Sequence, residues 1–162
     1  MPAKLRKIRR RRPSGEIMIE QTHDAAVIEA MLKKAASRMH AERGECFLIA
    51  YWGDEPIGIA GLETEVDAAL MCPLFVVENM RQRGVGACLV SAVRRAADTR
   101  GARTLYAIVP AALIDFFTRL GFDETACAEL DEAFGQPSML QWMGPNVAAC
   151  RLDISHDGLI ER

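Results

Sequence analysis

The run from Arg81 to Ala87 (RQRGVGA) restricts the local fold more than any other part of the sequence. An apolar stretch at 74–77 precedes it, and apolar residues at helical spacing follow over 85–96. This order predicts a strand, a glycine turn and a helix. The first backbone N–H groups of a helix lack partners within it, and the helix dipole adds partial positive charge there. With Arg81 and Arg83 alongside, the turn predicts a site for a phosphate group.

Two common phosphate-binding patterns do not match this run. A dinucleotide fingerprint needs a third glycine, where this chain has Leu89, and an acidic residue in the next strand, where it has Tyr106. A nucleoside triphosphate loop needs Gly-Lys followed by Ser or Thr, and the sequence contains none. Both classes are therefore excluded by the residues.

Composition fits one domain of ordinary globular type. The chain has 162 residues, half of them apolar, and no apolar run reaches the ~18 residues of a membrane helix. We expect no membrane partner. Scattered cysteines without a Cys-x-x-Cys pair, and no signal peptide, predict a cytoplasmic protein. The histidines are isolated in the sequence, so we expect no metal site. The cysteines are Cys46, Cys72, Cys88, Cys127 and Cys150, and the histidines are His23, His40 and His156.

Positive charge is concentrated at the N-terminal end. Seven Lys and Arg residues lie between Lys4 and Arg12, and without them the formal net charge falls from −2 to −9. Such an arm can bind nucleic acid or an anionic surface. We favour the interpretation that residues 1–15 form a solvated, disordered tail outside the fold, and we expect no nucleic-acid partner.

Periodicity and turn residues predict a mixed α/β domain. Strands are expected at 16–21, 46–52, 57–63, 68–77, 104–109, 122–128 and 148–153, with an edge or a bulge at Pro73. Helices are expected after Asp24, over 84–99 and, as a short piece, after Pro110.

This order of elements resembles the GNAT superfamily of acetyl-CoA-dependent N-acetyltransferases. The resemblance rests on the Arg-x-x-Gly-x-Gly run and on Phe116-Phe117 followed by Gly121-Phe122, and it extends from Met18 onward. It implies a single domain over 16–155, with a tail at 156–162. The fold is then a mostly antiparallel sheet of six or seven strands, splayed at the fourth, with about four helices. Acetyl-CoA is the implied co-substrate, and a homodimer is possible in this family.

The resemblance also implies roles for particular residues. In the family, the splayed strand holds the pantetheine arm, and one backbone N–H stabilises the oxyanion; here that donor is the Val76 N–H. Glu63 is the candidate base, acting through a water, with Glu78 a weaker one. A tyrosine that protonates the leaving thiolate in many relatives is replaced by Phe117, so Tyr51 and Tyr106 are the alternative acids. The implied cofactor-binding residues are Phe75, Val76, Val77, Arg81, Gln82, Arg83, Gly84, Val85, Gly86, Ala87 and Phe117.

The acceptor is less constrained by the sequence. Residues 61–63 and 67–70, and Phe116-Phe117 with Gly121-Phe122, look like the branch that acts on small amino acids, which includes N-acetylglutamate synthase-type domains and arsenic-resistance N-acetyltransferases. This resemblance favours a primary amine of a small molecule, an amino acid or an analogue, as the acceptor. Several such relatives hold the substrate carboxylate with an arginine in the fourth strand, where this chain has Cys72-Pro73. Two alternatives stay open: a non-catalytic acyl-CoA-binding module, and an acetyltransferase with a protein or RNA-associated acceptor. Loops around 36–45, 64–67 and 129–146 are expected to select the acceptor, with Trp52 and Trp142 as possible border residues.

Overall fold

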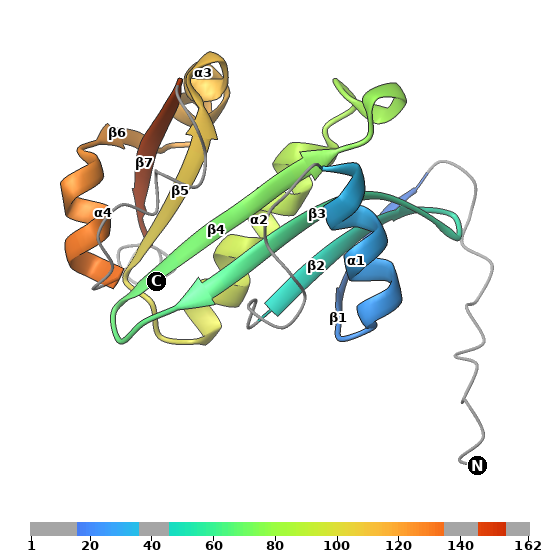
Figure 1. Ribbon diagram of the computed structural model, residues 1–162, viewed down its shortest axis with the longest axis horizontal. Coiled ribbons are helices and arrows are strands. Elements are labelled where there is room, and N and C mark those ends of the chain that lie inside the picture. Colours follow the sequence, from blue (N-terminus) through green and yellow to red (C-terminus); the bar gives the residue numbers. More distant parts are fainter. Residues whose placement is uncertain (1–15, 36–45, 135–145, 155–162) are drawn as a thin grey trace, which may run out of the picture.

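A seven-stranded sheet forms the centre of the protein. The computed structural model describes residues 16–35, 46–134 and 146–154, and the statements below concern these residues. The strand order is β1-β2-β3-β4-β5-β7-β6, and only the β4–β5 pair is parallel. The sheet is therefore mostly antiparallel (Figure 1). The strands are β1 (Ile17–Thr22), β2 (Cys46–Trp52), β3 (Glu55–Thr64), β4 (Ala68–Val76), β5 (Thr104–Pro110), β6 (Asp123–Thr125) and β7 (Val147–Asp153).

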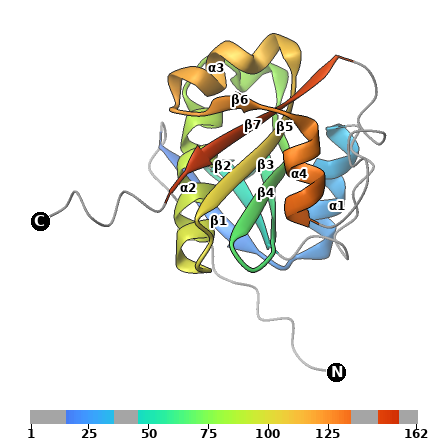
Figure 2. The same cartoon turned by 90° about the vertical axis from the view of Figure 1, so that its left-hand side faces the viewer.

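Four α-helices and two short 3-10 turns flank the sheet. They are α1 (Ala25–Lys34), η1 (Glu78–Met80), α2 (Val85–Thr99), η2 (Ala111–Leu113), α3 (Ile114–Arg119) and α4 (Cys127–Phe134). The Asp24 side chain accepts from the Ala26 N–H and caps α1, as the sequence predicts. Figure 2 shows α1 and α4 on one side of the sheet and α2 on the other.

Apolar side chains on both faces of the sheet make separate clusters. The largest lies under α2 and includes Leu89, Val93 and Phe117, all completely buried. On the opposite face, α1 covers a cluster around Ile59, and α4 covers another around Tyr106 and Leu130. The two helices on this face thus cover different ends of it.

The fourth strand leaves its neighbour halfway along. β4 pairs with β5 from Ala68 to Met71, opposite Thr104 to Ala107, and no further pairs follow in the described chain. Immediately after Met71, the register of β4 against β3 slips by one residue at Cys72-Pro73. Proline cannot donate to a ladder, so a bulge is the expected result. The bulge and the splay at strand four are both confirmed, and Figure 1 shows the two strands diverging.

The bulge requires glycine at one position of β3. A Cβ added to Gly61 would lie 2.5 Å from the carbonyl oxygen of Cys72. Real Cβ atoms do not approach so closely, so the two strands can pack here only with glycine.

Residues 127–134 differ from the sequence prediction. The strand expected at 122–128 ends at Thr125, and the next residues form α4, so residues 129–134 are helical rather than loop. Leu130 is the one buried residue of this eight-residue helix. Its neighbours are mostly acidic or small, which hides the pattern.

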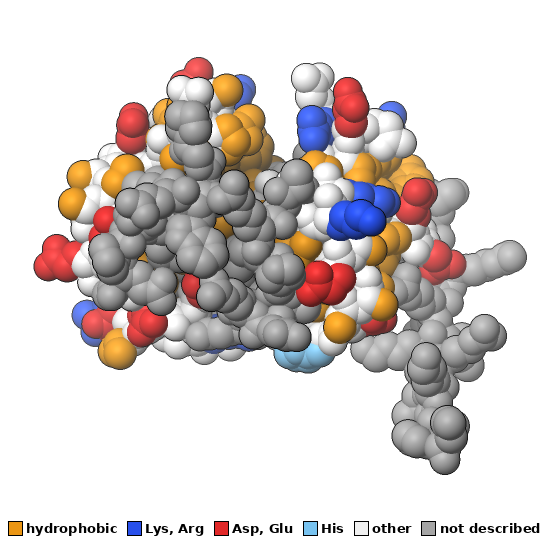
Figure 3. All heavy atoms as spheres, in the orientation of Figure 1, with side chains coloured by type: hydrophobic (Ala, Val, Ile, Leu, Met, Phe, Trp, Pro, Cys, Tyr) orange, Lys and Arg blue, Asp and Glu red, His pale blue; other side chains and the backbone are white. Residues whose placement is uncertain are grey.

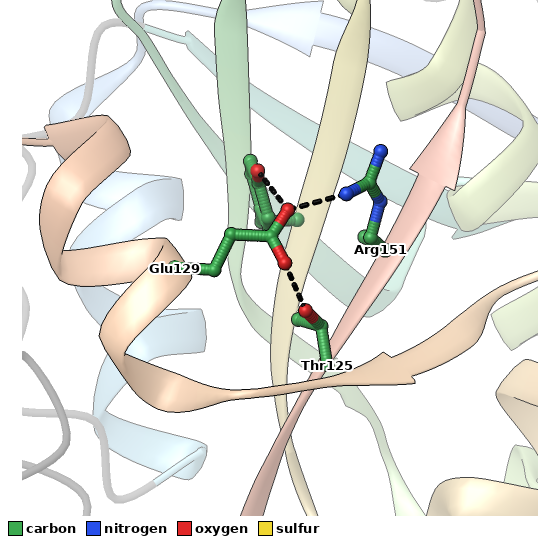
Figure 4. A network of polar contacts seen from close by, with 4 residues as sticks. Thr125, Glu129 and Arg151 are labelled. Atoms are coloured by element: carbon green, nitrogen blue, oxygen red, sulfur yellow. Dashed lines mark hydrogen bonds and ion pairs between the residues drawn. The ribbon is translucent and has the colours of Figure 1, made fainter.

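A hydrogen-bonded cluster around Glu129 attaches α4 to the sheet. The Glu129 carboxylate accepts from the Tyr106 hydroxyl at 2.9 Å, from the Thr125 hydroxyl and from the Arg151 guanidinium (Figure 4). These donors come from β5, β6 and β7, so one carboxylate joins three strands to the helix. The hydrogen bond from Thr125 is the main cause that lowers the pKa of Glu129.

The remaining predicted elements agree with the structure to within about two residues at their ends. The basic arm at 1–15, the tail at 156–162, the loop at 36–45 and Trp142 lie outside the described residues.

Replacing Glu129 with Gln should lower stability in a pH-dependent way. A carboxyl group whose pKa falls on folding stabilises the protein above its ordinary pKa, about 4.3, and this contribution disappears as the pH falls below it. We expect Glu129→Gln to cost about 1 kcal/mol at pH 7, a value reduced because the side chain is 34% exposed. The difference should shrink toward zero near pH 3. Urea unfolding at several pH values measures it, and a pH-independent difference would contradict the ionic contribution.

Candidate active site

The turn between β4 and α2 presents unpaired N–H groups to solvent. Gly84 has φ +82°, a left-handed conformation that glycine adopts without strain. Its carbonyl accepts from the Cys88 N–H at 3.0 Å, which starts the helix. No side chain caps α2, and its first turn holds no acidic residue. The N–H groups of residues 85–87 are therefore left for an anion.

The predicted turn residues differ in what they expose. Arg81, Gln82, Arg83 and Gly84 are exposed, while the Val85 side chain is buried in the core. Val85 can therefore contribute to a phosphate site only through its backbone N–H. Gln82, between the two arginines, has φ +61°, a left-handed backbone conformation.

Arg81 is held by two contacts to β4. Its Nε donates to the Val76 carbonyl at 2.9 Å, and its guanidinium carbon lies 5.6 Å from the centre of the Phe75 ring. The first contact aligns the guanidinium with the end of the strand, and the second is a cation–π arrangement. Arg81 thereby links the strand edge to the turn.

The open edge of β4 is formed by Leu74 and Val76. Val77 is bonded internally, because its N–H donates to the Ile57 carbonyl at 2.9 Å and its carbonyl accepts from the Met80 N–H at 3.0 Å. N–H and C=O groups of successive strand residues point to alternate sides. The backbone N–H and C=O groups of Val76 and Leu74 therefore point away from β3, into the gap beside β5. Val77 and Phe75 were predicted to hold the pantetheine arm. The backbone groups of Val77 are already hydrogen-bonded within the fold, and those of Phe75 point toward β3.

Phe117, predicted to line the cofactor site, is completely buried. Its ring packs edge-on against Phe116 and Phe122, with centroids 5.2 and 5.3 Å apart. Phe116 instead is half-buried and faces the turn, since a Cβ on Gly86 would lie 3.3 Å from its ring. Neighbouring helix residues differ by about 100° in direction, so Phe116 and Phe117 face different sides of α3.

Glu63 lies on β3, near the point where β4 leaves β5. It is in register with Leu70, on the face that α1 and α4 cover. Burial raises the pKa of the neighbouring Cys72 thiol to about 11, and the Glu63 carboxylate adds to the rise. The charge of Glu63 thus acts at the bulge itself. Glu78 is exposed on η1, at the opposite end of β4.

The two tyrosines considered as acids are both core residues. Tyr51 is 2% exposed and belongs to the cluster under α1. The Tyr106 hydroxyl donates to Glu129, and burial, followed by that hydrogen bond, raises the pKa of Tyr106. Trp52 is half-buried against the cluster under α2.

Two depressions flank the splayed strand. The molecular outline is notched where β4 and β5 separate, with apolar side chains along one side of the notch (Figure 3). A shallow, open hollow of about 370 Å³ lies at the other end of β4; its lining residues are Glu65, Val66, Asp67, Ala68, Thr104, Tyr106 and Ala133.

The chain belongs to the GNAT acetyltransferase family. The family model described as the acetyltransferase (GNAT) domain matches residues 43–124, half of the chain. By class the protein is an acyltransferase with acetyl-CoA as its co-substrate, and the predicted family is confirmed. A search of the curated proteins gave no match.

Solved structures with this fold include GNAT enzymes of several bacteria. N-acetylglutamate synthase from Neisseria gonorrhoeae, complexed with coenzyme A and N-acetyl-glutamate, superposes with a TM-score of 0.70 at 22% identity. That match covers 86% of this chain but only 35% of the synthase chain. A GNAT-family acetyltransferase from Staphylococcus aureus has a TM-score of 0.63 at 16% identity, covering 86% of this chain and 99% of that one. An IAA acetyltransferase from Bacillus cereus has a TM-score of 0.65 at 16% identity, covering 85% and 99%.

Two further properties concern the described residues alone. None of their helices combines the length and apolar character needed to cross a bilayer. Their His, Cys, Asp and Glu side chains form no group of three suited to a metal ion.

Ala87→Glu should weaken binding of the co-substrate while leaving the stability of the fold intact. A carboxylate in the first turn of α2 interacts favourably with the helix dipole, by about 0.3–1 kcal/mol, so stability should hold or rise. The same carboxylate would occupy the N–H groups and repel the diphosphate, so acetyl-CoA affinity should fall roughly tenfold or more. Calorimetric titration measures the affinity, and Ala87→Gln is the matched uncharged control. Unchanged affinity in Ala87→Glu would place the diphosphate elsewhere.

Proposed function

We propose that this protein transfers the acetyl group of acetyl-CoA to a primary amine of a small molecule by direct attack of the amine. The observation that carries the proposal is the continuity of two backbone surfaces that no neighbouring strand pairs. The open edge of β4, at Leu74 and Val76, leads directly into the turn with the free N–H groups of α2. The first surface suits an extended amide-containing arm and the second a diphosphate. Acetyl-CoA has both groups in that order.

In this arrangement the diphosphate binds the N–H groups of residues 85–87, with Arg81 and Arg83 adding charge. The pantetheine arm runs back along β4 toward the bulge, with Phe116 rather than Phe117 as its aromatic wall. The residues of the turn thus keep the roles expected from the sequence, with Val85 acting through its backbone.

The oxyanion donor is better assigned to the Leu74 N–H than to Val76. Because the Val76 carbonyl already accepts from Arg81, we expect Val76 to lie near the diphosphate rather than the thioester. Leu74 lies about 7 Å further along the strand, next to the bulge, and its N–H points into the same gap. The arm runs from the diphosphate past Val76 to Leu74, so the thioester at its far end lies beside Leu74. A fixed donor at the developing oxyanion contributes about 10²–10³ in rate.

Direct attack fits the state of the nearest cysteine. The Cys72 thiol is buried and its pKa is about 11, so it is protonated at neutral pH and a poor nucleophile. An acetyl-cysteine intermediate at this position is therefore disfavoured. The amine itself attacks the carbonyl carbon, the bond to sulfur breaks, and the thiolate collects a proton from water.

Glu63 is the proposed base. Ala60 is in register with Leu74, and Glu63 lies three residues further along β3, about 10 Å away. The carboxylate therefore acts through water, drawing the proton from an arriving ammonium group. It sits on the face between α1 and α4, where the acceptor is expected to approach.

Acceptor-stimulated release of coenzyme A thiol tests this function. Acetyl-CoA with a panel of small primary amines should give thiol release well above the rate with buffer, and mass spectrometry should show the amine gaining one acetyl group. Tight binding of acetyl-CoA without release by any amine would overturn the proposal and favour a protein acceptor or a binding module.

Glu63→Gln should reduce turnover in a pH-dependent manner. Loss of a general base costs about 10²-fold in kcat/KM for the acceptor near pH 7. The loss should diminish as the pH approaches the pKa of the amine, because a neutral amine needs no base. The affinity for acetyl-CoA should stay unchanged. Glu78→Gln is the matched control and should behave like the unmodified protein; equal loss in both variants, or no loss in Glu63→Gln, contradicts the role.

A further inference from the structure

The gap between β4 and β5 closes at a defined row of residues. The two parallel strands are paired from their N-terminal ends as far as Met71 and Ala107, and they separate beyond this row (Figure 1). β5 stays in the sheet past this point, because Ile108 and Val109 remain in register with β7. In the proposed function the arm of acetyl-CoA runs along β4 into this gap, so its acyl end meets the closed row.

Two side chains fill the closed end of the gap on the face that α4 covers. Ile108 follows Tyr106 by two residues on β5, so both side chains project from the same face of the sheet. Cys72 of β4 belongs to the same apolar cluster, together with Leu130 of α4. Cys72 is 8% exposed and Ile108 is 6% exposed. The first side chains beyond the closed row are therefore already packed against one another's cluster.

The surroundings hold these two side chains in place. The carbonyl oxygen of Cys72 lies 2.5 Å from the position that a Cβ on Gly61 would take, so β3 already lies against the bulge. Over the cluster, Leu130 is completely buried, and the next residue toward the N-terminus, Glu129, ties α4 to β5, β6 and β7 by hydrogen bonds (Figure 4). Space at the closed end can therefore increase only at the expense of packing or of these hydrogen bonds.

We propose that Ile108 restricts the acyl group that this enzyme accepts to acetyl, with Cys72 as the opposite wall of the acyl site. This inference rests on the placement of acetyl-CoA along β4 in the proposed function and adds the residue that selects the acyl chain. An acetyl group ends at the closed row, whereas each further methylene has to displace a packed side chain. One methylene too many in an apolar pocket lowers affinity or kcat/KM by about tenfold or more.

The affinity for acyl-CoA thioesters of increasing length tests the proposal without an acceptor. Acetyl-CoA, propionyl-CoA and butyryl-CoA share every group except the acyl chain, and calorimetric titration gives the dissociation constant of each. We expect butyryl-CoA to bind about tenfold more weakly than acetyl-CoA, or worse, with propionyl-CoA between them. Butyryl-CoA that binds as tightly as acetyl-CoA, or more tightly, overturns the proposal.

Shortening Ile108 should change this preference in steps. Ile108→Val removes one methylene and should bring the affinity for propionyl-CoA several-fold closer to that for acetyl-CoA. Ile108→Ala removes most of the side chain and should do the same for butyryl-CoA. Ile49→Val and Ile49→Ala are the matched controls, because Ile49 is also a buried strand residue but belongs to the cluster under α1. The control variants should keep the unmodified order and ratios.

Thermal unfolding establishes which variants are folded before their affinities are compared. Where an alanine variant does not fold, the Ile108→Val and Ile49→Val pair decides, because losing one methylene costs far less stability. Ratios that stay unchanged in a folded Ile108 variant, or that shift equally in the Ile49 variant, overturn the assignment to Ile108.

The acyl-CoA series and the amine panel fail separately. Equal affinity for the three thioesters overturns the role of Ile108, while thiol release in the presence of amines still supports acetyl transfer. Absence of thiol release with every amine overturns the proposed function, while the three affinities still decide whether Ile108 selects the acyl chain.

Discussion

The separation of β4 from β5 after Met71 is the constraint on which the rest of the site depends. A paired strand has no backbone groups to offer a ligand, whereas a strand that leaves its neighbour inside a sheet presents a row of them. The extra residue at Cys72-Pro73 breaks the ladder, and Gly61 lets the strands stay packed across the break. One local irregularity thereby leaves part of a structural sheet with an open edge, which the proposed function assigns to the binding of acetyl-CoA.

The two faces of the sheet also differ in how helices cover them. The face under α2 and α3 is a continuous apolar core, which fixes the turn and the first residues of α2. The opposite face is covered at its two ends by α1 and α4, in clusters that do not merge. In the proposed function, the side under α2 supports the coenzyme site, and the divided side contacts the acceptor.

Much of the fold follows from local sequence patterns. Glycine and helical periodicity after Arg81 identify the turn and α2, and Pro73 identifies the bulge, because each effect acts within a few residues. Other assignments require the three-dimensional structure. The proposed choice of Leu74 as oxyanion donor depends on which residues of β4 bond to β3, and the proposed use of Phe116 in place of Phe117 depends on how α3 is rotated. The helix at Cys127–Phe134 was missed because Leu130 is its one buried residue, with Ala133 and Phe134 only partly buried beside it.

Arg81 illustrates how the fold prepares the site in advance. An exposed arginine ordinarily samples many rotamers, and fixing it on a ligand costs conformational entropy. Here the Val76 carbonyl and the Phe75 ring already hold the guanidinium in one orientation. Much of that ordering is therefore completed during folding, and an arriving ligand meets a cation that needs little further immobilisation.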